Sequence, residues 1–329
     1  MNLREKIYQM FILGTDGGGY QTALENGLGG VIFFTHDIKE VEQFKNFVNE
    51  IKETAKLPPF LSIDQEGGRV ERTENIHNGK KYLSAKYAYE KGEEFLKNQT
   101  EKIAKELKSY GLNMNFSPCV DVNTNLDNPI IGERAFSDNP DDVIKGEKIV
   151  SEIYRKSGII PCVKHFPGHG DAGADSHLTL PKINLTLEEM QMHIKPFRAA
   201  VKNGIEMVMI AHLHCTCFEK EAIPASLSKN AIDYLRNNLE FDGVTISDDM
   251  IMKGVSAFGS VEACEMGIRA GLNMFIYRDS KPETINIIEE ISQKAENDCE
   301  LRTNIEKSYE KIIKLRDEMT GCRRSEGSE

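Results

Sequence analysis

Short apolar runs alternate with amphipathic stretches along almost the whole chain, and this alternation limits the possible folds more than any other feature. Runs of β-branched and aromatic residues bounded by Gly, Pro or polar residues are typical of buried strands, and about eight of them recur here. Apolar residues between them follow helical spacing, as at Val41, Phe44 and Val48. The predicted strands are residues 10–13, 31–34, 60–63, 112–117, 158–163, 205–211, 243–247 and 271–277.

A regular strand–helix alternation predicts an α/β fold with a parallel sheet, and about eight units favour a single closed (β/α)8 barrel of the TIM type. Helical spacing is continuous over residues 84–110 and 284–319, each predicted as one long helical region. The chain of 329 residues exceeds the roughly 250 of a typical barrel, which leaves room for long βα loops. An open doubly wound sheet is the alternative, but residues 17–19 lack the spacing of a dinucleotide fingerprint.

Domain organisation and location follow from composition. We expect one catalytic barrel over residues 1–320 and a flexible polar tail over 321–329. The net charge of −11 argues against a nucleic-acid partner, because no basic stripe is present to neutralise phosphates. Seven cysteines without framework spacing favour a reducing compartment, and neither a secretory signal nor a membrane-length apolar stretch is present. We therefore expect a cytoplasmic protein without a membrane partner, and we favour a monomer.

A polar loop begins where the predicted strand 158–163 ends, which is the end of a parallel strand where chemistry collects. Its sequence is Lys-His-Phe-Pro-Gly-His-Gly-Asp over residues 164–171, and Asp-Ser-His follows at 175–177. Three glycines, at 168, 170 and 173, would let such a loop bend and move. Asp175 is two residues from His177, so its carboxylate can orient and charge the imidazole as a general acid/base near neutral pH.

Other polar side chains also fall at predicted strand ends. On one barrel these residues would converge on one face as an acid/base constellation. Asp248 could act as a nucleophile, although a helix-capping role is also open to it and to Asp249. Asp64 could bind sugar hydroxyls or serve as a turn residue. The strand-end set is Asp64, Lys164, His165, His212, Asp248 and Asp249.

Two groups of residues have the composition of metal ligands. His212 and His214 precede Cys215 and Cys217, but the Cys-x-Cys spacing is not that of a zinc finger and no second pair matches it. A metal-dependent barrel hydrolase is a rival mechanism, although we predict no metal and no other cofactor. The cluster that such a hydrolase would use is His165, His169, Asp171, Asp175 and His177.

Five ordered blocks of sequence resemble the β-N-acetylglucosaminidases of glycoside hydrolase family 3, the NagZ type. The resemblance spans most of the chain, and the loop that ends in Asp-Ser-His is the most specific of the blocks. Members of this type carry their acid/base dyad on a mobile loop of a single barrel. The blocks are residues 63–70 (IDQEGGRV), 131–136 (IGERAF), 164–177, 224–226 (PAS) and 246–250 (ISDDM).

The resemblance implies a role for each matching residue. Asp248 would be the nucleophile of a retaining reaction, His177 would be the acid/base and Asp175 would hold its imidazole. The terminal N-acetylglucosamine would be bound by Asp64, Arg72, Arg134, Lys164 and His165.

The activity implied is an exo-acting, retaining β-N-acetylglucosaminidase that uses no cofactor. In bacteria such an enzyme would act on N-acetylglucosamine-containing saccharides or muropeptides and so recycle peptidoglycan. Besides the metal-dependent hydrolase, two rivals stay open: a non-catalytic sugar-binding module, and a phosphorylase in which phosphate replaces water as acceptor.

Overall fold

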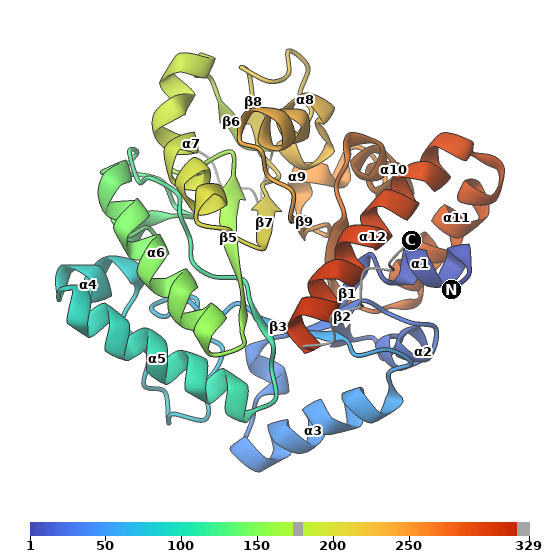
Figure 1. Ribbon diagram of the computed structural model, residues 1–329, viewed down its shortest axis with the longest axis horizontal. Helices are drawn as coiled ribbons and strands as arrows, with labels where there is room; N and C mark the ends of the chain where they lie inside the picture. Colours follow the sequence, from blue (N-terminus) through green and yellow to red (C-terminus); the bar gives the residue numbers. More distant parts are fainter. Residues whose placement is uncertain (174–179, 321–329) are drawn as a thin grey trace, which may run out of the picture.

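The computed structural model describes residues 1–173 and 180–320, and its centre is a closed barrel of parallel strands (Figure 1). The order around the barrel is β1-β10-β9-β7-β5-β4-β3-β2, which confirms the predicted (β/α)8 architecture. All eight predicted strands are present. Their bounds are β1 Phe11–Asp16, β2 Gly30–Phe33, β3 Phe60–Ile63, β4 Met114–Asn115, β5 Ile160–Phe166, β7 Met207–Ile210, β9 Val244–Asp249 and β10 Met274–Asp279.

Helices surround the barrel, and several begin with the capping chemistry that the sequence provides. The Thr186 hydroxyl accepts the amide of Glu189 in a capping box, and Asn139 caps a helix that starts at Pro140. The helices are α1 Leu3–Tyr8, α2 Tyr20–Glu25, α3 Val41–Thr54, α4 Ala85–Glu90, α5 Glu93–Ser109, α6 Pro140–Lys156, α7 Leu187–Lys202, α8 Lys229–Asp233, α9 Lys253–Ser256, α10 Ser260–Ala270, α11 Pro282–Asn297 and α12 Cys299–Thr320.

Three local features differ from the prediction. Gly92, with φ of 101°, separates α4 from α5 within the predicted region 84–110. Asp298 is extended and separates α11 from α12 within 284–319. A two-stranded sheet of β6 (Lys182–Ile183) and β8 (His214–Cys215) was not predicted. Segments of two residues carry too little hydrophobic periodicity to be recognised from sequence.

The core lies between the strands and the helices that cover them. Phe33 of β2 packs edge-on against Phe44 of α3 with ring centroids 5.1 Å apart. Phe166 of β5 packs in the same way against Phe197 of α7 at 5.3 Å. These contacts bury large apolar side chains on the outer wall of the barrel, which leaves the carboxyl ends of the strands for polar residues.

The two ends of the described chain meet where the barrel closes. Phe11 of β1 pairs in parallel register with Phe275 of β10, and their rings stack at 5.4 Å. Helix α1 packs against α11 and α12, and Tyr8 donates a hydrogen bond of 2.5 Å to Glu289. Closure therefore depends on elements that are far apart in the sequence.

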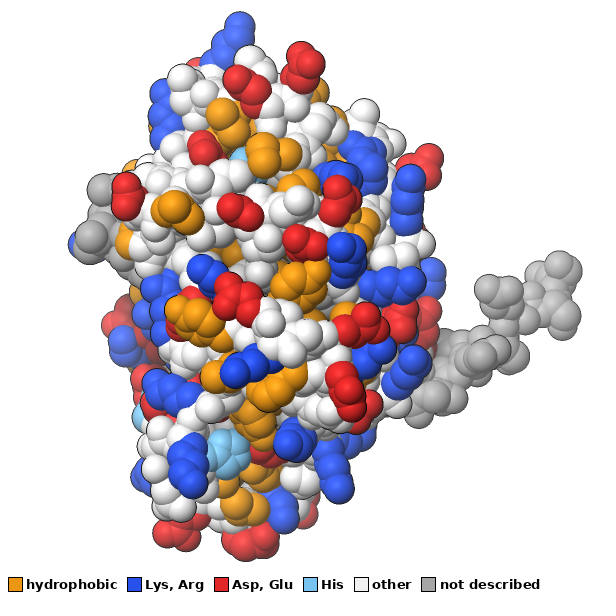
Figure 2. All heavy atoms as spheres, turned by 90° about the vertical axis from the view of Figure 1, so that its left-hand side faces the viewer, with side chains coloured by type: hydrophobic (Ala, Val, Ile, Leu, Met, Phe, Trp, Pro, Cys, Tyr) orange, Lys and Arg blue, Asp and Glu red, His pale blue; other side chains and the backbone are white. Residues whose placement is uncertain are grey.

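The surface that carries α4 to α7 has mixed charge. Figure 2 shows acidic and basic side chains interspersed on this face instead of gathered into one area. Among the helices in the described part of the chain, none has the length and apolarity needed to cross a membrane.

Glu147 is a buried carboxyl on α6. Glu147 is 1% exposed, and its Oε2 has no hydrogen-bond partner among the described residues. Burial raises the pKa of Glu147 to about 7. A glutamate in an unfolded chain has a pKa of about 4.3. Between about pH 4.3 and pH 7 the unfolded chain has therefore released a proton that the folded protein still holds. The contribution of Glu147 to stability therefore falls as the pH rises from about 4.3 to about 7.

We expect Glu147→Gln to raise the free energy of unfolding by about 1–3 kcal/mol at pH 8 and to change it little near pH 5, because glutamine mimics the protonated acid. Urea denaturation of both proteins at the two pH values measures the difference. Asp141→Asn on the same helix is the control, since Asp141 is exposed and pairs with Lys195. A gain for Glu147→Gln that did not grow with pH would contradict the assignment.

Candidate active site

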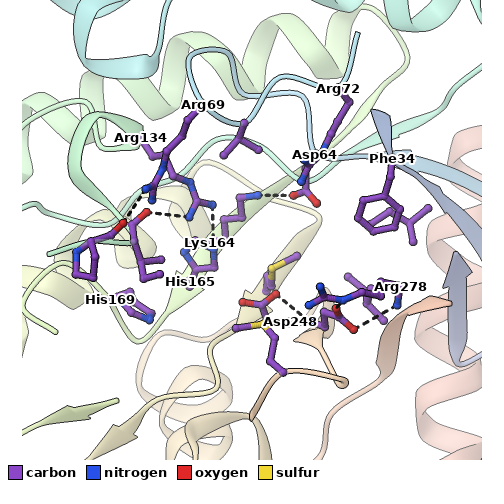
Figure 3. Close-up of a pocket in the computed structure, with 18 residues that line it drawn as sticks. Phe34, Asp64, Arg69, Arg72, Arg134, Lys164, His165, His169, Asp248 and Arg278 are labelled. Carbon is purple, nitrogen blue, oxygen red and sulfur yellow. Dashed lines mark hydrogen bonds and ion pairs between the residues drawn. The ribbon is translucent and has the colours of Figure 1, made fainter. Parts of the chain in front are cut away.

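A pocket of about 370 Å³ opens at the carboxyl ends of the strands, and charged and apolar side chains line it in equal numbers (Figure 3). Its size is within the range of small-molecule sites. Six of the eight residues predicted from sequence line it, and Asp175 and His177 lie outside the described residues. The polar lining residues are Asp64, Arg69, Arg72, Arg134, Lys164, His165, His169, Asp248, Asp249 and Arg278.

Two strands continue further into the site than predicted. Lys164 and His165 lie within β5, and Asp248 lies within β9, although all three were expected just after the strands. Lys164 forms a parallel bridge with Cys119, and Asp249 pairs with Ile276 of β10. This pairing holds the polar residues on rigid backbone, which fixes their positions better than a loop would.

Two cations and two carboxylates form a buried ion-pair network on one side of the pocket. The Lys164 ammonium lies 2.6 Å from Asp64 and 2.5 Å from Glu66. Arg134 donates Nε and Nη2 to the two oxygens of Glu66 at 2.9 and 2.8 Å. Burial opposes the ionised form of Glu66, but Arg134 and Lys164 outweigh it and hold the pKa of this carboxyl well below its usual value.

The same balance keeps Lys164 charged. Burial disfavours its ammonium, but Asp64 and Glu66 raise the pKa of Lys164 above its usual value. Lys164 is 1% exposed, so its charge acts in a site of low dielectric, where it is weakly screened. Asp64 and Lys164 therefore present a fixed pair of acceptor and donor to the pocket.

Asp248 lies across the pocket from this pair, as Figure 3 shows. Burial alone would raise the pKa of its carboxyl. His165, His212, the Asp249 amide and Lys164 outweigh that effect, so the pKa of Asp248 lies below its usual value. The Asp249 amide donates to Asp248 Oδ1 at 2.8 Å, which leaves the other oxygen without a partner among the described residues. An ionised carboxylate with a free oxygen is suited to nucleophilic attack.

Asp121 organises the start of the loop after β5. Its buried carboxylate accepts the backbone amide of His165, the amide of His169 at 2.6 Å and the His165 Nδ1 proton at 2.7 Å. The Cys119 thiol donates to it as well, at 3.2 Å. The His165 Nε2 lies 3.3 Å from Arg134 Nη2. Asp121 thus orients the His165 ring.

The glycines of this loop serve close packing in its described part. A Cβ at Gly170 would lie 1.7 Å from the Val122 carbonyl oxygen, and one at Gly168 would lie 2.6 Å from His193 Cβ. Asn128 donates to the carbonyl of His169 at 2.8 Å and further anchors the loop. The close packing around Gly168 and Gly170 therefore does not favour the loop mobility that was expected from these glycines.

Of the cluster that the rival metal-dependent hydrolase would use, His165, His169 and Asp171 do not form a metal-ligand group, and Asp175 and His177 lie outside the described residues. His165 is bound to Asp121, and Asp171 accepts from Thr124 at 3.2 Å. Over residues 1–173 and 180–320, the one group with metal-ligand spacing is Cys119, Asp121 and His165. Their polar atoms are already joined by hydrogen bonds, and the Arg134 guanidinium beside them disfavours an added cation.

The two histidines that alternate before the cysteines have separate partners. His212 contacts Ser226 Oγ through Nδ1 at 2.8 Å and the Asp249 carbonyl through Nε2 at 3.1 Å. His214 contacts the carbonyl of Glu219 at 3.0 Å, while Cys215 is buried. His212 thus supports the backbone next to Asp248.

Glu66, Asp121 and Arg278 were not predicted as site residues. Glu66 stands inside the block 63–70, and its position two residues after Asp64 was a usable signal. Asp121 follows the fourth predicted strand beyond Pro118, and Arg278 follows the eighth directly. Both therefore satisfied the strand-end criterion that selected the other residues.

A closed (β/α)8 barrel with an ionised carboxylate facing a fixed carboxylate–lysine pair at its strand ends has the architecture of a barrel glycosidase. The comparison with family models agrees. The chain belongs to glycosyl hydrolase family 3, whose N-terminal domain model matches residues 2–315.

Individual relatives are similar over most of this chain. Beta-hexosaminidase A of Pseudoalteromonas piscicida is 33% identical over 270 residues, which are 75% of this chain and 45% of that protein. The beta-hexosaminidase of Idiomarina loihiensis is 28% identical over 275 residues, 80% of each chain. A family 3 beta-N-acetylglucosaminidase from Paenibacillus sp. str. FPU-7 superposes with a TM-score of 0.89 at 28% identity, over 100% of this chain and 64% of that one. The chain therefore spans less than half of the Pseudoalteromonas protein and less than two thirds of the Paenibacillus structure.

We expect Asp121→Asn to lower the free energy of unfolding at pH 7 by about 2–4 kcal/mol, because the buried His165 Nδ1–H loses its charged acceptor. His165 lowers the pKa of Asp121 against the effect of burial, so this contribution is present above the unfolded pKa of about 3.9 and is lost at lower pH. Urea denaturation measures it. Cys119→Ser keeps a donor to Asp121 and is the matched control; equal losses in the two variants would contradict the role of Asp121.

Proposed function

We propose that the chain is an exo-acting, retaining β-N-acetylglucosaminidase whose catalytic domain comprises residues 1–320. The observation that carries the proposal is Asp248, a carboxylate with a lowered pKa that faces the Asp64–Lys164 pair across the pocket. Membership of glycosyl hydrolase family 3 and the names of the relatives support the reaction class.

In the proposed first step, a free oxygen of Asp248 attacks the anomeric carbon of the terminal sugar. A bond forms between that carbon and Asp248 while its bond to the aglycone oxygen breaks. His177 donates a proton to the leaving oxygen, and Asp175 holds the imidazole. In the second step His177 takes a proton from water, the water oxygen attacks the same carbon, and Asp248 is released with net retention.

The terminal N-acetylglucosamine is proposed to bind on the side of the pocket opposite Asp248. The Asp64 carboxylate accepts from sugar hydroxyls, while Lys164 and Arg134 donate to sugar oxygens. Arg72 lies over the Phe34 ring at 5.5 Å and lines the pocket, and it is proposed to donate to the sugar as well. His165 completes this set, with its ring oriented by Asp121.

The natural substrates are proposed to be N-acetylglucosamine-containing saccharides, among them muropeptide fragments of peptidoglycan. A cytoplasmic monomer is part of the same proposal. Thin-layer or mass-spectrometric detection of free N-acetylglucosamine from purified muropeptides tests the substrate, separately from the reaction.

We expect Asp248→Asn to lower kcat on 4-nitrophenyl N-acetyl-β-glucosaminide at least about 10³-fold, because the amide cannot form the covalent intermediate. Release of nitrophenolate measures the rate. The control is Asp242→Asn, which alters an exposed aspartate that precedes β9 at the opposite end of the strand. Full activity of Asp248→Asn would exclude this nucleophile.

We expect His177→Ala to lower kcat about 10²- to 10⁴-fold on substrates with poor leaving groups, and much less on good ones that need no proton. A series of aryl N-acetyl-β-glucosaminides of graded phenol acidity measures the dependence. A uniform loss across the series would show that His177 is not the acid.

A further inference from the structure

Arg278 is a cation of the pocket that has no place among the predicted site residues or the proposed sugar contacts. It lies on β10, the strand next to the one that carries Asp248, and it lines the same pocket. Its side chain is 46% exposed, so it stands at the mouth of the pocket and not in its depth. A cation at this place can meet a ligand that enters from solvent.

Asp249 holds Arg278 in one orientation. The Arg278 Nε donates to Asp249 Oδ2, and the Arg278 backbone amide donates to Asp249 Oδ1 at 3.3 Å. The Asp249 side chain is 13% exposed against 46% for Arg278, so the carboxylate lies behind the guanidinium. The two Nη groups have no hydrogen-bond partner among the described residues. They form an oriented edge of the kind that binds a carboxylate through two parallel hydrogen bonds.

The exposure of Arg278 places this edge at the mouth of the pocket, through which the leaving group of an exo-acting enzyme extends. The proposed sugar contacts include Asp64 after β3 and Lys164 on β5, and β3 lies opposite β9 in the closed barrel. A sugar that spans the pocket from Asp64 to Asp248 has its anomeric carbon at β9. Asp248 displaces the aglycone in line, so the leaving oxygen lies on the face of the anomeric carbon opposite Asp248. With the terminal sugar inside the pocket, the aglycone extends from that carbon through the mouth, where Arg278 is 46% exposed. Figure 3 shows Arg278 near Asp248 at the pocket.

The charge of the lining also favours an anionic ligand group. Five lining residues are cationic and three are carboxylates, and Glu66 pairs with two of the cations, so five cations meet four carboxylates in a chain whose net charge is −11. Arg69 and Arg72 form no ion pair with a carboxylate among the described residues. A local excess of positive charge in an acidic protein attracts anionic substrates to the site. The cationic residues are Arg69, Arg72, Arg134, Lys164 and Arg278, and the carboxylates are Asp64, Asp248 and Asp249.

We propose that Arg278 is a specificity-determining residue of the leaving-group subsite, and that it selects N-acetylglucosaminides whose aglycone carries a carboxylate. This inference rests on the proposed glycosidase function. It adds the chemical class of the aglycone and the residue that recognises it.

The experiment compares 4-carboxyphenyl N-acetyl-β-glucosaminide with its uncharged methyl ester. The readout is the ratio of kcat/KM for the acid to kcat/KM for the ester, normalised to the wild type, so that the difference in phenol acidity cancels. The variants are Arg278→Gln, Arg278→Glu and Arg278→Lys. The matched control is Arg155→Gln, because Arg155 is 37% exposed and its Nε pairs with Glu206, just before β7 at the other end of the barrel.

We expect Arg278→Gln to lower the ratio about three- to tenfold and Arg278→Glu to lower it further, since a half-exposed charge pair is partly screened by water. Arg278→Lys should fall between wild type and Arg278→Gln, because lysine keeps the charge but not the two-pronged geometry. Raising the salt concentration should lower the wild-type ratio. Arg155→Gln should leave it unchanged.

A ratio that stays at the wild-type value in both Arg278→Gln and Arg278→Glu would overturn the inference. Because both substrates are measured on the same folded fraction, partial unfolding of a variant cannot change the ratio. If the wild type cleaves neither substrate, the proposed function itself fails. Comparison of buffers with and without inorganic phosphate separates two anions that Arg278 could bind, the aglycone carboxylate and phosphate. If phosphate raised the rate on the ester and Arg278→Gln abolished that increase, Arg278 would bind a phosphate acceptor. That outcome would overturn the aglycone assignment.

Discussion

The site depends on the carboxylate of Glu66, which holds Lys164 and Arg134 at the same time. These three residues come from the segment after β3, from β5, and from the short helix at Gly132–Arg134. Buried charges are tolerated only when paired, so a shift of any one segment would leave a charge without its partner. Glu66 therefore links three segments that are distant in sequence, and Asp64 gains its position beside Lys164 from the same link.

The two walls of the pocket are built by different means. The wall that contains Lys164 and His165 is fixed by buried ion pairs and by the hydrogen bonds of Asp121. The opposite wall consists of β9 and β10, where backbone pairing and the contact of His212 with the Asp249 carbonyl hold Asp248. Charged groups stabilise a reaction most effectively when they do not have to move during it. The charged side chains of both walls are held in place before a substrate binds.

Hydrophobic periodicity was enough to predict the barrel, because each strand is a compact apolar run with clear boundaries. It also placed Asp64 and Asp248 at strand ends. It could not separate α4 from α5 at Gly92, since helical spacing continues across the break. Nor could it show that Glu66 and Asp121 organise the site, because their partners lie in other segments and only the folded chain brings them together.

The closure of the barrel has a consequence for the order of assembly during synthesis. Phe11 leaves the ribosome long before its neighbour Phe275, because the other strands of the barrel lie between them in the sequence. Strand β1 must wait with one edge unpaired until β10, the last strand of the barrel, is made, and such pairing between distant segments is slow. Asp248 and Arg278 belong to the last two strands, so a nascent chain carries no complete catalytic machinery until that final edge is sealed.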